Sequence, residues 1–126
     1  MQELEAKEFL EEAFRQAANA PGMEAARQKY GKLKMRSASR TAASNGNLYQ
    51  KARTVMTGKA GFIAAETDSR LVLLTGSGFG QRNPAVVELE FSDTEVTATA
   101  WAKEGLIPQK SAPSAVDAIF AELGLL

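Results

Sequence analysis

The feature that most constrains the fold is a hydrophobic period of two in the second half of the chain. Between residues 85 and 91 the apolar side chains stand at every second position, and Glu88 and Glu90 lie between them. Residues 95–101 alternate in the same way, and the Ser-Asp-Thr sequence at 92–94 is typical of a tight turn. Because a slip of one residue would turn every apolar side chain toward water, this pattern predicts an antiparallel hairpin with one buried face.

The same pattern occurs earlier in the chain. Residues 61–67 and 70–76 are two apolar runs separated by an Asp-Ser pair, which predicts a second hairpin. In residues 32–36 apolar side chains alternate with Lys and Arg, which favours a strand with one wet face, with continuation of a helix as the alternative. Residues 48–58 follow an Asn-Gly turn and are interpreted as a further strand.

Helical spacing is found at both ends of the chain. Residues 3–18 carry an apolar stripe at i, i+3, i+4 and i+7, and a shorter helix is predicted at 23–30. Pro113 suits the first turn of a C-terminal helix over 114–123, and Gly124 suits its end. We therefore predict an α+β fold with one or two N-terminal helices, an antiparallel meander of four to six strands and a C-terminal helix packed on the curled sheet. The whole chain, 1–126, is predicted to be a single domain made of a helical segment at 1–30, a sheet at 32–103 and a helix at 113–124.

Three glycines at alternate positions, Gly76, Gly78 and Gly80, raise the question of a nucleotide-binding loop. The phosphate-binding loop needs G-x-x-x-x-G-K-[ST], and the dinucleotide fingerprint needs G-x-G-x-x-G opening a helix. Neither spacing is present, and the sequence continues into a predicted strand, without a helix N-terminus to hold a phosphate. We interpret the run as a bent connection between strands.

The 126 residues include neither Cys nor His. Thiolate and histidine catalysis and Cys/His zinc sites are therefore excluded within this chain, and we predict no cofactor. Carboxylates leave an enzymatic alternative open. Glu66 and Asp68 could share a metal beside a turn, and Glu88 and Glu90 could act as an acid/base pair, although solvated strand faces explain both pairs as well.

The charges balance, with 15 basic and 15 acidic residues, but their distribution is uneven. Residues 25–65 hold nine basic side chains and no acid, whereas acids dominate on both sides of this segment. Such a block predicts a basic surface for an anionic partner, a lipid headgroup or an acidic protein. Pairing with the acids of the same fold is the competing interpretation. The predicted partner-binding residues are Lys29, Lys32, Lys34, Arg36, Arg40, Lys51, Arg53 and Lys59.

Residues 61–107 resemble bacterial pleckstrin-homology-like domains. The similarity consists of a Thr-Asp-x-Arg-Leu turn from Thr67 to Leu71, a glycine-containing loop, and a Lys-x-Gly-Leu-like end at Lys103 to Leu106. The resemblance implies a non-enzymatic module that binds lipids, peptides or its own copies, with the helix at 114–123 capping a curled sheet.

These observations predict a cofactor-free binding or assembly module that self-associates or meets an anionic or protein partner. Nucleic acid ranks below the other partners because neither a recognition helix nor an aromatic-rich sheet motif is present. The alternatives are a carrier with an apolar cavity and a small enzyme that uses carboxylates or Lys. The acidic start at 1–14 is unlike a signal peptide, and apolar runs fall short of the ~20 residues that span a bilayer. We thus expect a cytoplasmic chain without a transmembrane segment, although a processed secreted chain would look the same. The residues expected around a carrier cavity are Phe62, Ile63, Leu73, Val87 and Phe120.

Overall fold

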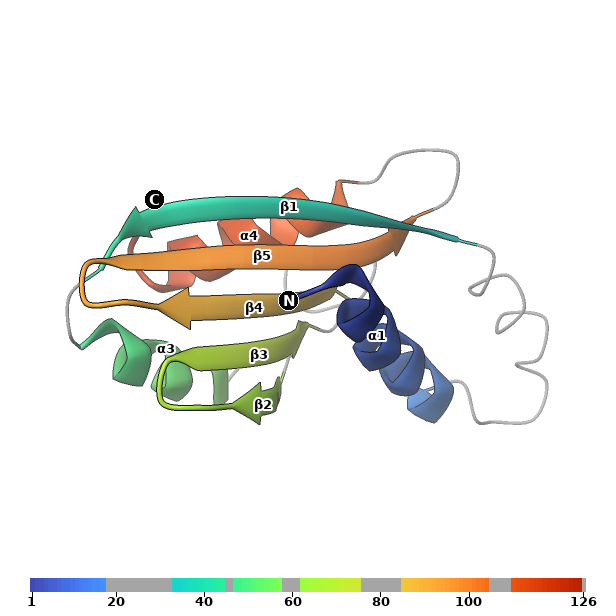
Figure 1. Ribbon diagram of the computed structural model, residues 1–126, viewed down its shortest axis with the longest axis horizontal. Coiled ribbons are helices and arrows are strands. Elements are labelled where there is room, and N and C mark those ends of the chain that lie inside the picture. The colour runs from blue at the N-terminus through green and yellow to red at the C-terminus, as the bar shows by residue number, and fades with distance from the viewer. Residues whose placement is uncertain (18–32, 45–46, 58–61, 76–84, 105–109, 126) are drawn as a thin grey trace.

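The computed structural model describes residues 1–17, 33–44, 47–57, 62–75, 85–104 and 110–125. Within them, five antiparallel strands form one sheet in the order β1-β5-β4-β3-β2, and three helices pack on it (Figure 1). The predicted α+β class, with a C-terminal helix on an antiparallel sheet, is confirmed. The glycine run at 76–80 and the predicted helix at 23–30 lie outside the described residues. In chain order the elements are α1 (Glu3–Ala17), β1 (Lys34–Ala43), α3 (Leu48–Thr57), β2 (Phe62–Glu66), β3 (Arg70–Thr75), β4 (Ala85–Phe91), β5 (Glu95–Glu104) and α4 (Ser111–Glu122).

Both predicted hairpins are present. The β2–β3 turn is closed by a backbone bond from Thr67 N–H to Arg70 O, and the β4–β5 turn by one from Ser92 N–H to Glu95 O, each 2.8 Å long. The first strand does not continue this meander, because β1 pairs along its full length with the last strand, β5. The sheet thus joins parts of the chain that are about half its length apart.

The prediction of a strand at 48–58 is wrong, since Leu48–Thr57 is the helix α3. Leu48 and Ala52 are buried at i and i+4, and Val55 packs against the same cluster at i+7. This is the spacing of a helical apolar stripe, which the imperfect alternation of the segment concealed.

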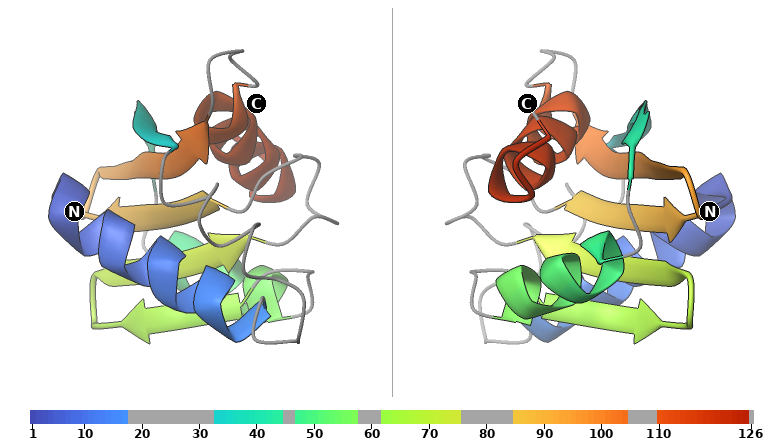
Figure 2. Two further views of the ribbon diagram at one scale, coloured as in Figure 1. Left: turned by 90° about the vertical axis from the view of Figure 1, so that its right-hand side faces the viewer. Right: turned by 90° about the vertical axis from the view of Figure 1, so that its left-hand side faces the viewer.

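The main core lies between one face of the sheet and the helices α4 and α3 (Figure 2). On β5, Ala98, Ala100 and Ala102 are completely buried beneath α4, whose Ala115 and Phe120 face them. Small side chains on both elements allow the helix to approach the sheet closely. Glycine ends α4 as predicted: Gly124 has φ 73°, and its N–H donates to the carbonyl of Ala121.

Helix α1 covers part of the opposite face, so the helices flank the sheet on both sides (Figure 2). Its buried Ala6 and Leu10 contact Val72 and Val86, and Trp101 packs partly buried against the same cluster. This second, smaller core explains why β3 and β4 are apolar on both faces at one end.

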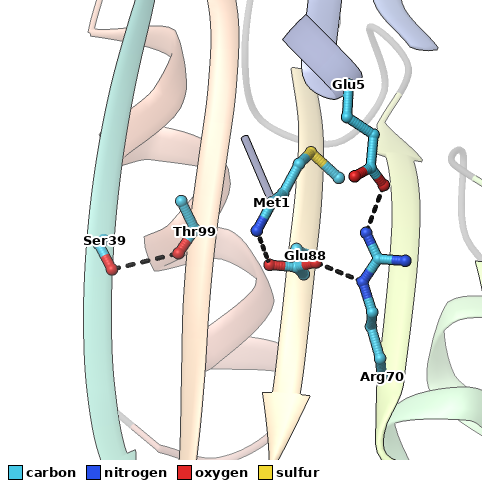
Figure 3. Close-up of polar contacts among 6 residues, drawn as sticks. All are labelled: Met1, Glu5, Ser39, Arg70, Glu88 and Thr99. Atoms are coloured by element: carbon cyan, nitrogen blue, oxygen red, sulfur yellow. Dashed lines mark hydrogen bonds and ion pairs between the residues drawn. The ribbon is translucent and has the colours of Figure 1, made fainter. Parts of the chain in front are cut away.

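A solvated strand face was one of the two interpretations of Glu88, and this interpretation is wrong, because Glu88 is buried and only 3% exposed. Its carboxylate accepts hydrogen bonds from the α-amino group of Met1 and from Arg70, which also donates to Glu5 of α1 (Figure 3). Two positive groups compensate the desolvation of one carboxylate, so the charge is tolerated beneath the start of α1.

Candidate partner-binding edge

Strand β1 forms one edge of the sheet. One side of the strand pairs with β5, and no described residue pairs with its other side. None of its residues is buried, in contrast to β3 and β4, which are almost continuously buried. Edge strands present unpaired backbone N–H and C=O groups that can pair with another chain. In the described part of the chain, β1 is thus an accessible ten-residue edge.

The basic residues of β1 all lie on the side of the sheet that α4 covers. Ala38 and Ala42 pack against the α4 core. Lys34, Arg36 and Arg40 lie an even number of residues from these alanines in the strand, so their side chains are on the same face. Lys34 and Arg36 are exposed, and neither forms a hydrogen bond or ion pair with any other described residue. These two neighbouring cations are available to a partner.

Arg40 differs because α4 supplies its partners. Its Nη1 donates to Oδ1 of Asp117 at 2.7 Å, and its guanidinium carbon lies 5.8 Å from the ring centre of Phe120. Both charged side chains remain about half exposed. The positive charge of the edge is therefore concentrated toward the Lys34 end of β1.

The remaining predicted basic residues lie elsewhere or outside the described residues. Lys51 donates to the carbonyl oxygen of Leu123 at the end of α4, and Arg53 forms two hydrogen bonds with Glu66 of β2. Because β2 is the opposite edge of the sheet, Arg53 does not join the cations of β1. Lys29, Lys32 and Lys59 lie outside the described residues.

The other face of β1 carries hydroxyl groups, a feature that the sequence analysis missed. Ser39 Oγ lies 3.3 Å from Thr99 Oγ1 (Figure 3). Thr41 Oγ1 lies 3.0 Å from Thr97 Oγ1, and the two contacts link β1 to β5. Ser37 stands opposite Trp101 in the register. The signal was the Ser-x-Ser-x-Thr alternation itself, between the basic positions.

Two of the four candidate carboxylates, Glu66 and Glu88, are engaged in structural ion pairs. The hydrogen bond from Arg53 lowers the pKa of Glu66. Burial raises the pKa of Glu88, but hydrogen bonds from the Met1 amino group and Arg70 outweigh it, so the pKa is lowered overall. Among the described residues, no group of three or more Asp or Glu side chains is placed to hold a metal ion.

A polar groove of about 440 Å³ lies between α3 and the β2–β3 turn. Tyr49 donates a hydrogen bond to the carbonyl of Thr67 there, and its ring packs edge-on against Phe91 with centroids 5.3 Å apart. Burial, followed by the negative charge of Glu66, raises the pKa of Tyr49. The Arg53–Glu66 pair occupies the groove wall with compensated charge, so the groove offers no free basic group.

The side chains expected around a carrier cavity belong mostly to the packed core. Leu73, Val87 and Phe120 are at most 2% exposed and lie in the cluster beneath α4, and Ile63 packs against it. The side chain of Phe62 lies outside the described residues.

Comparisons with known proteins add no relative: no protein-family model matches the chain, and no curated protein matches it significantly. Of the helices that the structure describes, none is long and apolar enough to cross a membrane.

Proposed function

We propose that this chain is a non-catalytic binding module that takes an extended acidic segment of a partner protein onto the free edge of β1. The observation that carries the proposal is a pair of exposed cations, Lys34 and Arg36, that have no partner among the described residues and lie on a ten-residue edge strand. Backbone hydrogen bonds of the added strand would supply affinity, and alternate side chains would supply specificity.

Charge on an edge strand also protects it from unwanted pairing. Pairing of β1 with β1 of a second copy would bring positive side chains together without a compensating acid, because Lys34, Arg36 and Arg40 share one face and the strand contains no acid. Like charges facing one another across strands are destabilising. The charges that oppose self-pairing favour an acidic partner strand, so the partner is a different protein rather than a second copy.

An acidic protein also fits better than a lipid surface. Each Lys or Arg near an anionic membrane contributes about 1 kcal/mol, so two free cations give weak attachment. A partner strand interacts with the same two charges and also forms backbone hydrogen bonds along the whole edge of β1. This choice agrees with the peptide-binding class that the pleckstrin-homology-like resemblance implies.

The test is fluorescence anisotropy with a labelled, end-capped peptide of alternating Glu and Thr, ETETETETE, and a Lys counterpart, KTKTKTKTK. We expect the acidic peptide alone to bind, and affinity to fall as salt rises because exposed charges are screened. Arg36→Glu should weaken binding at least tenfold. Lys7→Glu, on the outer surface of α1, is the matched control with the same change in charge and should have less than a twofold effect. Equal binding of the two peptides, or equal loss in both variants, would reject the proposal.

A further inference from the structure

The two faces of β1 differ enough to specify the partner strand further, an inference that rests on the proposed function. We infer that the partner carries acidic side chains at two alternate positions in its C-terminal half, on the face that continues toward α4. We infer also that hydroxyl side chains occupy the positions between them and continue on the opposite face.

The face follows from the pleat of the sheet. Residues directly opposite each other on neighbouring strands lie on the same face, with Cβ atoms about 4.5–5.5 Å apart. Lys34 and Arg36 are on the α4 side of β1, so acids that meet them must be two residues apart and on that side of the added strand. An acid at the position between them would face Ser37 and Met35 instead.

The position along the strand follows from the partners that the cations already have. Arg36 stands opposite Ala102, so no acid faces it across the existing ladder. Glu104 stands opposite Lys34, but its carboxylate accepts the Ser111 N–H at 2.7 Å and stabilises the start of α4. At the other end of β1, Asp117 already satisfies Arg40. An acidic side chain of the partner therefore stabilises the complex most when it lies opposite Arg36, less when it lies opposite Lys34 and least when it lies opposite Arg40.

The opposite face selects hydroxyl side chains. Ser39 and Thr41 form a ladder of close oxygen contacts with Thr99 and Thr97 of β5. Cross-strand pairs of Thr with Thr or Ser contribute to sheet stability, and a β-branched residue also suits the extended conformation. Threonine on the added strand would extend this ladder outward by one strand.

The direction follows from the sheet, in which every pair of strands is antiparallel. Antiparallel pairing is also slightly more stable per residue than parallel pairing. An antiparallel partner runs opposite to β1, so its C-terminal half lies beside Lys34 and Arg36 at the start of the strand. This places the two acids near the C-terminal end of the bound segment.

Three end-capped peptides of identical composition test the face and the direction. VTVTVTETE places both acids as inferred, VTVTVETTE divides them between the two faces in every register, and ETETVTVTV moves them to the other end. We expect the first peptide to bind at least tenfold more tightly than either of the others, measured by competition against labelled ETETETETE.

A charge exchange tests the contact with Arg36. In VTVTVTKTE the seventh residue, which would stand opposite position 36, is basic. We expect Arg36→Glu to bind VTVTVTKTE more tightly than VTVTVTETE, reversing the order of the unaltered protein, while Lys7→Glu retains the original order. Circular dichroism of both variants should match that of the unaltered protein, because both side chains are exposed.

The outcomes separate the inference from the proposed function. If ETETETETE binds but VTVTVTETE and VTVTVETTE compete equally, the assignment of both acids to one face is wrong and the binding function stands. Tighter binding of ETETVTVTV overturns the antiparallel direction. If neither ETETETETE nor any patterned peptide binds, both the inference and the proposed function fail.

Discussion

Arg40 of β1 and Asp117 of α4, 77 residues apart in the chain, are joined by a 2.7 Å hydrogen bond between Nη1 and Oδ1. This contact ties the exposed edge strand to the C-terminal helix and compensates the charge of one of the three cations of the edge. The lopsided charge of β1 is thus a product of the tertiary structure, since the strand sequence alone spreads its positive charge from Lys34 to Arg40.

Replacing Asp117 should release Arg40 and strengthen acidic binding. We expect Asp117→Asn to bind ETETETETE about threefold more tightly, because a third cation becomes available. The free energy of unfolding should change by less than about 1 kcal/mol, as for other exposed ion pairs. Glu122→Gln, which removes an acid from the C-terminal end of α4, is the control. Equal gains in both variants in the anisotropy assay would attribute the effect to net charge instead of to Arg40.

Glu88 should make the free energy of unfolding depend on pH in the acidic range. Its pKa is lowered in the folded chain, so the stabilisation is complete above its unfolded pKa near ~4.3 and is lost as the pH falls through the folded pKa. Urea denaturation at pH 7, 5 and 3 should show this loss. Glu88→Gln should cost roughly 3 kcal/mol at pH 7, because two positive groups lose their buried partner, and should flatten the pH dependence. An unchanged slope in the variant would assign the acid sensitivity to other carboxylates.

Tyr49 should titrate above its ordinary pKa of about 10, because burial and then Glu66 disfavour the phenolate. The protonated form is favoured by the fold, so its contribution is present below the unfolded pKa and is lost as the pH rises through the folded pKa. The chain has two tyrosines, so the difference in ultraviolet absorbance between the unaltered protein and Tyr49→Phe isolates this side chain. A midpoint at or below 10 would contradict the half-buried, hydrogen-bonded geometry. The variant should lose about 1 kcal/mol of stability with the hydrogen bond to Thr67.

Close packing of α4 predicts a strong position dependence for Ala→Leu substitutions. Ala115 is fully buried against the sheet, whereas Ala121 is exposed on the same helix. Ala115→Leu should destabilise the protein by about 1–3 kcal/mol, since the added volume forces side chains or the helix away. Ala121→Leu should change stability by less than about 0.5 kcal/mol. Similar thermal midpoints for both variants would mean that α4 does not approach the sheet as closely as described.

Local pattern predicted those features that depend on near neighbours in the chain. The turns at Asp68 and Asp93, the C-terminal end of α4 at Gly124 and the alternation of basic residues in β1 were all readable. In each case the residues that determine the feature lie within a few positions of it in the sequence. Turn-forming residues and the period of apolar side chains are therefore enough to predict it. The helix α3 is the exception, because its single apolar stripe is short and polar residues interrupt it.

Contacts between residues that are far apart in the sequence could not be predicted in this way. An antiparallel α+β chain with a basic middle and a helix at each end follows from composition and local period, so the amino-acid pattern was enough to predict it. The pairing of β1 with β5, the position of α1 on the face opposite α4 and the compensation of individual charges became known from the folded chain alone. Glu88 is buried because Met1 and Arg70 reach it, and Arg36 remains available because its cross-strand neighbour is Ala102. The physical reason is that burial and pairing depend on which distant segments meet, a choice made by the packing of the whole sheet.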